Sequence, residues 1–130
     1  MVEVKEFFQA DEWKIENHAP IIEAPVSVKK GEIVRVRAAV GEDIAHPHQK
    51  EHHIGWIALF FRPEGETFPY RLGRANFSVT EEADQDASSG YITHHEVCLS
   101  FKPEKGGTIF ATSLCNRHGS WQSSKDLKVS

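Results

Sequence analysis

Short segments in which polar and apolar residues alternate recur along most of this 130-residue chain, and residues that favour turns separate them. A period of two residues is typical of a strand that buries one face. The clearest segment is 32–38, between Gly31 and Gly41. The segment 52–61 is predicted as a central strand because it is rich in aromatic and β-branched residues; it ends at the turn 62–65 and is expected to pair with an antiparallel neighbour. No long helical period competes, so the sequence predicts an all-β sandwich of about seven antiparallel strands in two sheets. The other predicted strands are 70–72, 75–79, 92–101, 108–113 and 125–129, and the polar stretch 81–90 is predicted to be an exposed loop.

Size and charge narrow the class of protein. A chain of 14.7 kDa fits one domain spanning 1–130, and its net charge of -4, with scattered basic residues, gives no reason to expect a nucleic-acid or membrane-surface partner. Charges alternate over the first residues, where a signal peptide needs a basic start and an apolar run, so we expect a cytoplasmic protein. Cys98 and Cys115 are expected to be reduced in that compartment, and Cys98, in a predicted strand, to be a buried thiol.

A cysteine and a histidine lie three residues apart near the C-terminus, in Cys115-Asn116-Arg117-His118-Gly119. A thiolate and an imidazole at this spacing can bind one transition metal from a single turn, and Gly119 would let that turn close tightly. The segment 46–53, with the sequence HPHQKEHH, supplies further imidazoles. Together the two segments predict a redox metal site.

The chain has eight histidines, and their positions decide which of them can reach such a site. His46 precedes Pro47, which holds it extended and reduces the entropy lost on binding, so His46 is a better ligand candidate than His48. His52 and His53 are neighbours on a predicted strand, so their side chains point to opposite faces and only one of them is expected to reach a given metal. Both faces of that strand are apolar, and alternation alone leaves this choice open.

These motifs together resemble the superoxide reductases, specifically the one-iron neelaredoxin type, over nearly the whole chain. The resemblance rests on Glu16-Asn17-His18-Ala19-Pro20, His46-Pro47, Glu51-His52-His53-Ile54, Gly73-Arg74 and the run 115–121. It implies an immunoglobulin-like β-sandwich that holds one non-haem iron ion through four equatorial histidines and one axial cysteine. It also implies that Glu16 can bind the iron as a sixth ligand in the oxidised state. At the matching positions the five permanent ligands would be His18, His46, His52, His118 and Cys115.

The same resemblance implies an activity and its partners. The activity is the one-electron reduction of superoxide to hydrogen peroxide, so we expect an oxidoreductase. The electron is expected from a separate rubredoxin-like carrier, because the chain lacks the four-cysteine domain that holds a second iron in two-iron relatives. Relatives of this short type are commonly tetrameric, so a homotetramer is expected.

One position departs from the family pattern. The family usually has a lysine between the glutamate and the histidine of the first motif, and its ammonium is held to attract superoxide and to help donate a proton. Here the position is Asn17, which carries neither a charge nor a titratable proton. Lys50, between His46 and His52, is the candidate substitute, with His48 second. The alternative is that Lys50 is an ordinary solvated charge.

Other classes of metal protein share parts of this pattern. A blue-copper electron-transfer sandwich usually needs a methionine shortly after its last histidine, and the only methionine here is Met1. A non-catalytic sandwich that binds zinc would use four ligands in a tetrahedron, one fewer than the pattern offers. Superoxide dismutation uses the same substrate, but the thiolate favours reduction as the main reaction.

For residues near these motifs the sequence predicts ordinary roles. Trp56 is expected in the core or an interface, and for Trp121 ordinary packing is favoured over shielding of the metal site. His94 and His95, near the start of a predicted strand, are expected to face solvent. Glu51 is either an acceptor that orients the neighbouring ligand or a surface carboxylate.

Overall fold

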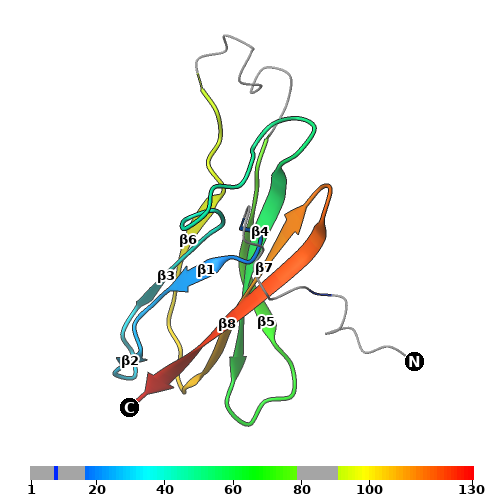
Figure 1. Cartoon of the computed structure of the whole chain (residues 1–130). Coiled ribbons are helices and arrows are strands. Elements are labelled where there is room, and N and C mark those ends of the chain that lie inside the picture. Colours follow the sequence, from blue (N-terminus) through cyan, green and yellow to red (C-terminus); the bar gives the residue numbers. More distant parts are fainter. Residues whose placement is uncertain (1–7, 9–16, 79–90) are drawn as a thin grey trace, which may run out of the picture.

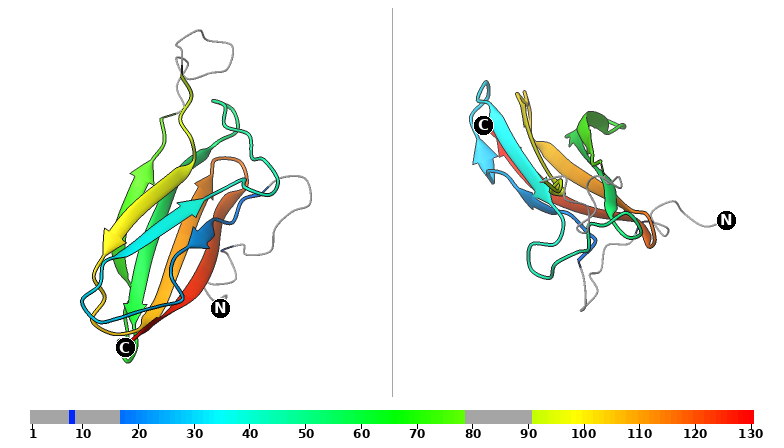
Figure 2. Two further views of the ribbon diagram at one scale, coloured as in Figure 1. Left: turned by 90° about the vertical axis from the view of Figure 1, so that its left-hand side faces the viewer. Right: turned by 90° about the horizontal axis from the view of Figure 1, so that it is seen from above.

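The computed structural model describes residue 8 and residues 17–78 and 91–130; Glu16, Val79 and the predicted loop 81–90 lie outside them. The described chain forms eight strands and no helix, so it contains no helix that could cross a membrane. A three-stranded sheet, in the order β1-β3-β6, faces a five-stranded sheet, in the order β2-β8-β7-β4-β5 (Figures 1 and 2). The predicted all-β sandwich is confirmed. The strands are β1 (Ile21–Glu23), β2 (Ser27–Val28), β3 (Val34–Ala39), β4 (Ile54–Pro63), β5 (Tyr70–Asn76), β6 (Glu96–Phe101), β7 (Gly107–Cys115) and β8 (Gly119–Val129).

The hydrophobic core lies between the two sheets and is built by alternation along the strands. In β7 every second residue from Gly107 to Cys115 is buried, which is the pattern of a strand with one face toward a core. Burial of these apolar side chains is the main force that holds the sheets face to face. Fully buried members are Val34, Val36 and Ala38 of β3, Ile57 and Leu59 of β4, Ile109 and Ala111 of β7 and Leu127 of β8.

The predicted strands 70–72 and 75–79 fall on one continuous strand, β5, which ends at Asn76, so 77 and 78 are not part of it. A Cβ atom at Gly73 would lie 2.7 Å from Cδ1 of Leu99, so the glycine leaves room for a β6 side chain to pack against β5 instead of ending the strand. The sequence did not predict β1 and β2, which are three and two residues long and pair with β3 and β8. The β2 pair with β8 is parallel, whereas all the other strand pairs are antiparallel.

Two antiparallel hairpins turn at a glycine, and one of them, β7–β8, carries residues of the predicted metal site. Gly65 has φ +79° in the predicted turn between β4 and β5, and Gly119 has φ +82° where it pairs with Cys115 at the β7–β8 turn. Backbone at these angles favours glycine because a Cβ atom is strained there. The tight turn predicted after Cys115 is therefore confirmed.

Cys98 is exposed, so the expectation of a buried thiol is wrong. Val97, the preceding residue of β6, is 8% exposed and faces the core. Successive strand residues point to opposite faces, which turns Cys98 outward, where it pairs with Arg37 of β3.

Candidate metal centre

Five potential metal ligands from three segments of the chain come together. His18 lies just before β1, His46 and His52 lie in the loop between β3 and β4, and Cys115 ends β7, with His118 in the turn that follows. The donor atoms of His18, His46, His52 and Cys115 all lie within 4.8 Å of one another. His118 joins them, because its Nδ1 is 3.2 Å from Nε2 of His18 and 3.7 Å from Sγ of Cys115.

The four imidazoles form a closed ring of neighbours. The centroids of His18 and His46 are 4.8 Å apart, and those of His46 and His52 are also 4.8 Å apart. The distances from His118 to His52 and to His18 are both 5.0 Å. Each ring stands at 75° to 84° to the next. Such an arrangement lets four imidazole nitrogens surround one ion, and His52, not His53, is the member that the fold brings in.

Asn116 fastens the Cys115 turn to the β3–β4 loop. Its backbone N–H donates to the carbonyl of His53 (3.1 Å), and its side-chain Oδ1 accepts from the backbone N–H of His53 (2.8 Å). Its Nδ2 donates to the backbone carbonyl of Glu51 (3.0 Å). Gln49 and His52 form an isolated β-bridge within that loop. These bonds hold the segment of His52 against the segment of Cys115 and His118.

The core of the sandwich supports His18 directly. Trp121 of β8 is fully buried and stacks on the His18 ring, with centroids 4.5 Å apart and planes 14° apart, and its Nε1–H donates to the His118 carbonyl (3.2 Å). The buried Ser113 hydroxyl donates to the carbonyl of His18 (2.6 Å). Trp121 therefore packs in the core, the role favoured for it, and it also covers one face of His18, whereas Ser113 was not predicted at all. The only signal for Trp121 was its place three residues after His118.

His46 is held in the form that a metal needs. Its Nδ1 lies 2.6 Å from the carbonyl of Pro47, which must accept the bond because a carbonyl has no proton to give. The other ring nitrogen, Nε2, is therefore an unprotonated lone pair, and it is buried without a hydrogen-bond partner. Burial, assisted by the neighbouring His18 and His52, lowers the pKa of His46 to about 3. The ring is thus neutral at pH 7, and the site fits a metal cation.

Three polar residues next to ligand candidates in the sequence, Asn17, Lys50 and Glu51, are not members of the ligand cluster. Asn17 is 6% exposed, and its Oδ1 accepts a hydrogen bond from the backbone N–H of Ile44 (2.8 Å), so its side chain fastens the segment of His18 to the β3–β4 loop. Lys50 lies exposed on the turn between Gln49 and His52. Glu51 is exposed, and the contact that the structure gives it with Asn116 is through its backbone carbonyl.

His48 lies with His95 in a second group of imidazoles, beside the first. Their ring centroids are 5.0 Å apart, and both residues are buried, 7% and 6% exposed. The expectation that His95 faces solvent is therefore wrong, whereas His94 is exposed as predicted. His95 is enclosed because it packs against the loop at Gly41, where a Cβ atom would lie 3.2 Å from its Cε1.

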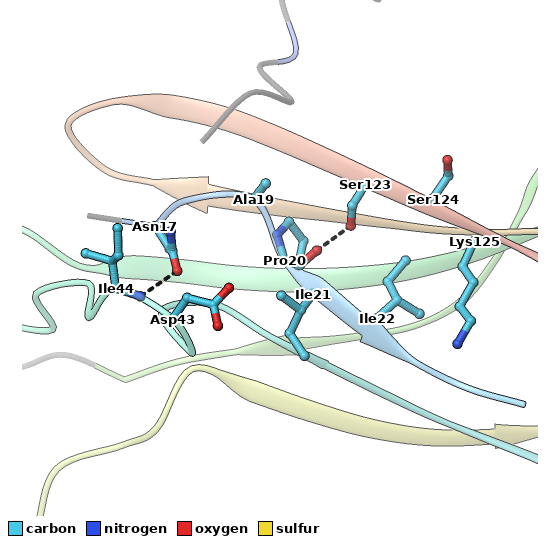
Figure 3. Close-up of a pocket in the computed structure, with 10 residues that line it drawn as sticks. All are labelled: Asn17, Ala19, Pro20, Ile21, Ile22, Asp43, Ile44, Ser123, Ser124 and Lys125. Carbon is cyan, nitrogen blue, oxygen red and sulfur yellow. Dashed lines mark hydrogen bonds between the residues drawn. The ribbon is translucent and has the colours of Figure 1, made fainter. Parts of the chain in front are cut away.

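An open groove of about 710 Å³ runs beside the metal centre along β1 (Figure 3). It extends from Asn17 to Lys125, and the Ser123 hydroxyl donates to the carbonyl of Pro20 across it. None of the five clustered ligand candidates lines this groove. The metal centre is therefore a separate site.

Comparisons with known proteins agree with this geometry. The family model for desulfoferrodoxin matches residues 10–124. Neelaredoxin from Megalodesulfovibrio gigas is 39% identical over 125 residues, which cover 95% of this chain and 96% of that protein. The superoxide reductase of Pyrococcus furiosus is 37% identical over 126 residues, or 96% of this chain and 99% of that protein.

Solved structures give the same result for the fold. The superoxide reductase (neelaredoxin) of Archaeoglobus fulgidus in the reduced form superposes with a TM-score of 0.80 and 43% identity, over 94% of this chain and 98% of that one. That of Ignicoccus hospitalis gives a TM-score of 0.81 at 35% identity, over 99% of this chain and 100% of that one. Sequence, fold and the grouping of four imidazoles with one thiolate thus agree, and the chain belongs to the desulfoferrodoxin family.

Proposed function

We propose that this protein is a superoxide reductase, which reduces superoxide by one electron to hydrogen peroxide at a single iron ion. The observation that carries the proposal is the closed ring of four imidazoles beside a thiolate, in a member of the desulfoferrodoxin family. Its relatives in Pyrococcus furiosus and Archaeoglobus fulgidus are themselves named superoxide reductases.

The residues that would hold the iron are the four imidazoles of the ring together with the Cys115 thiolate. Five donors favour iron over structural zinc, which takes four. A blue-copper centre uses two histidines and one cysteine with a weak axial ligand, so four gathered imidazoles support it less well. The proposed ligand set is His18, His46, His52, His118 and Cys115.

The protein side chains bind and tune the metal. As ligands the imidazoles would be neutral and would leave the positive charge of the ion uncompensated, and the thiolate would donate electron density to it. Trp121 covers one face of His18 and keeps water from that ring. When bound, iron supplies the single electron that superoxide needs and regains it from a reductant. Two protons complete the hydrogen peroxide, and we propose that solvent supplies them.

The finer parts of the proposal rest on the sequence. We propose a rubredoxin-like electron donor, a homotetramer, a cytoplasmic location and one domain over residues 1–130. Glu16 as the sixth ligand of oxidised iron, and Lys50 as the substitute for the usual family lysine, also stay predictions. For Lys50 the support is its position on the exposed turn that precedes His52.

The proposal is tested by loading the protein with iron and mixing its reduced form with a pulse of superoxide. We expect one iron per chain, a thiolate-to-Fe(III) absorption band on oxidation, and one hydrogen peroxide per superoxide without release of oxygen. Bound iron that does not react with superoxide would refute the activity and leave the ligand set standing. Release of oxygen would show dismutation instead.

A pair of cysteine variants identifies the thiolate. Cys115→Ser is expected to lose the absorption band, because it removes the sulfur nearest the imidazole ring. Cys98→Ser is the matched control, since Cys98 is exposed on the outer face of β6 and is expected to keep both band and activity. A band that survives in Cys115→Ser would contradict the assignment.

A further inference from the structure

Two buried imidazoles outside the proposed iron ligands have nitrogen atoms without partners. Nδ1 of His48 and Nδ1 of His95 are both buried and make no hydrogen bond. The two rings are neighbours, 5.0 Å apart and nearly perpendicular, at 84°. A buried polar atom without a partner lowers the stability of the fold, so a pair of them on adjacent rings calls for a physical explanation.

The hydrogen bonds around His48 determine its tautomer. The Thr93 hydroxyl donates its proton to the carbonyl of Ser78 (3.0 Å). Its oxygen must then accept from Nε2 of His48, which lies 2.8 Å away. The proton of the neutral ring is thus on Nε2, and Nδ1 is a lone pair that can accept a proton or bind a metal ion.

The surroundings of the pair favour a ligand that needs few donors. The other imidazoles nearby are His94 and His46, 5.0 and 6.1 Å from His95, and His53, 6.4 Å from His48. Among the residues that the structure describes, the only group with three or more donor atoms close together is that of His18, His46, His52 and Cys115. The His48–His95 pair therefore offers two nitrogens, and Phe77 packs against the edge of His48 on another side.

We propose that His48 and His95 form a second metal site, in which their two Nδ1 atoms bind one Cu(I) ion. Imidazole nitrogen is a normal ligand for copper, and Cu(I) accepts two donors where Zn(II) takes four. The ion would give both buried Nδ1 atoms a partner at once, and it requires His95, like His48, to carry its proton on Nε2. This inference does not depend on the superoxide reaction, because it concerns residues that are absent from the proposed iron ligand set.

The test is an anaerobic Cu(I) titration of the reduced, iron-loaded protein against a chromophoric Cu(I) chelator. The protein carries Cys98→Ser, because the exposed Cys98 thiol is a second place where copper could bind. We expect one Cu(I) per chain with no loss of iron. No uptake in competition with the chelator, or uptake that releases an equal amount of iron, would overturn the proposal.

Variants assign the copper to the pair. In the same background, His48→Gln is expected to weaken Cu(I) binding by about tenfold or more, since it removes one of two ligands. His94→Gln is the matched control, because His94 is an exposed neighbour of His95 and is expected to bind Cu(I) as the parent does. Equal binding by His48→Gln and the parent would overturn the assignment.

A measurement on the Cys98→Ser protein, without a change at His48, decides the case even where the His48 variant does not fold. X-ray absorption at the copper edge is expected to show two nitrogen neighbours with the scattering pattern of imidazole. A sulfur neighbour would place the copper at Cys115 and overturn the proposal. Because the readout is the environment of copper, it stays interpretable whether or not the iron centre reduces superoxide.

Discussion

Trp121 connects the core of the sandwich to the metal centre at the level of one residue. Its indole stacks on His18 and its N–H donates to the His118 carbonyl, so one side chain holds two of the five proposed ligands. It is fully buried, and any change in its size also changes the packing of β8. The orientation of two imidazoles therefore depends on a residue that touches no metal.

We expect Trp121→Phe to lower the free energy of unfolding by about 1–3 kcal/mol, because it removes the hydrogen bond to His118 and leaves a small cavity. It is also expected to speed the loss of iron to a chelator. The control is Trp56→Phe, since Trp56 is only half-buried and lies 5.8 Å from Arg74 in a cation–π contact away from the ligands. Urea denaturation and iron release measure both effects, and equal iron release from the two variants would contradict the role of Trp121.

The role and the burial of a single residue could be predicted where its neighbours in the sequence determine them, and not where contacts with distant residues do. The choice of His46 over His48 followed from the neighbouring proline, which acts locally. The burial of His95 depends on the loop at Gly41, and the exposure of Cys98 depends on which face of β6 packs against the other sheet. A pattern read along the chain carries no information on such contacts.

The β7–β8 hairpin is the element that brings Cys115 and His118 together. Gly119 has φ +82°, and a Cβ atom there would meet no other atom within 4 Å. Gly65, in the β4–β5 hairpin, has φ +79° and equally open surroundings. The two glycines therefore share the same backbone strain on substitution and differ in their distance along the chain from the proposed ligands.

Gly119→Ala and Gly65→Ala are each expected to lower the free energy of unfolding by about 1–2 kcal/mol, the cost of a Cβ atom in left-handed backbone. Only Gly119→Ala is expected to weaken iron binding as well, because it shifts the turn that carries His118. Denaturation and competition with an iron chelator measure the two effects. Weaker iron binding in Gly65→Ala as well would mean that iron affinity follows global stability.

Elements were predictable where their pattern is local. β3 and β7 alternate clearly and β4 is a run of aromatic and β-branched residues, and the sequence placed each of them to within three residues at either end. β1 and β2 are too short for a pattern and exist because β3 and β8 offer edges to pair with. The continuity of β5 through Gly73 depends on Leu99 of the facing sheet, which no local rule contains.

Charge over the whole molecule acts on the approach of superoxide. The net charge of -4 repels an anion, so a lysine near the site is expected to matter for the association rate. Lys50 precedes His52 on an exposed turn, whereas Lys30 lies by the other end of β8, where its backbone N–H donates to Ser130. The two lysines carry the same charge at different ends of the sandwich.

If Lys50 steers superoxide, Lys50→Ala will slow the oxidation of reduced iron and weaken the dependence of that rate on ionic strength. Lys30→Ala changes the net charge equally and is expected to leave the rate near that of the parent. Pulsed generation of superoxide at several salt concentrations measures both. Equal rates for the two variants would make Lys50 an ordinary surface charge.

The stability of the whole metal-free protein is expected to depend on pH through its buried histidines. Burial is the largest cause that lowers the pKa of His46 to about 3 and that of His48 to about 4, and it also lowers the pKa of His95. Between these values and 6.5 the unfolded chain binds more protons than the folded one, so stability is lost as the pH falls. For His48 alone the shift corresponds to on the order of 3 kcal/mol.

We therefore expect the free energy of unfolding of the metal-free protein to fall between pH 7 and pH 4, and to fall less steeply in His48→Gln. The variant removes one group that must be neutral in the folded protein. Unfolding of the variant is therefore accompanied by the uptake of up to one proton fewer, and its free energy of unfolding depends less steeply on pH. His94→Gln, which changes an exposed histidine, is expected to keep the parent slope. Urea denaturation across this pH range gives the slopes. If the free energy of unfolding of His48→Gln falls with pH as steeply as that of the parent, then His48 accepts a proton without unfolding of the protein. Its buried Nδ1 lone pair could accept that proton only if an anion or a water molecule entered beside it.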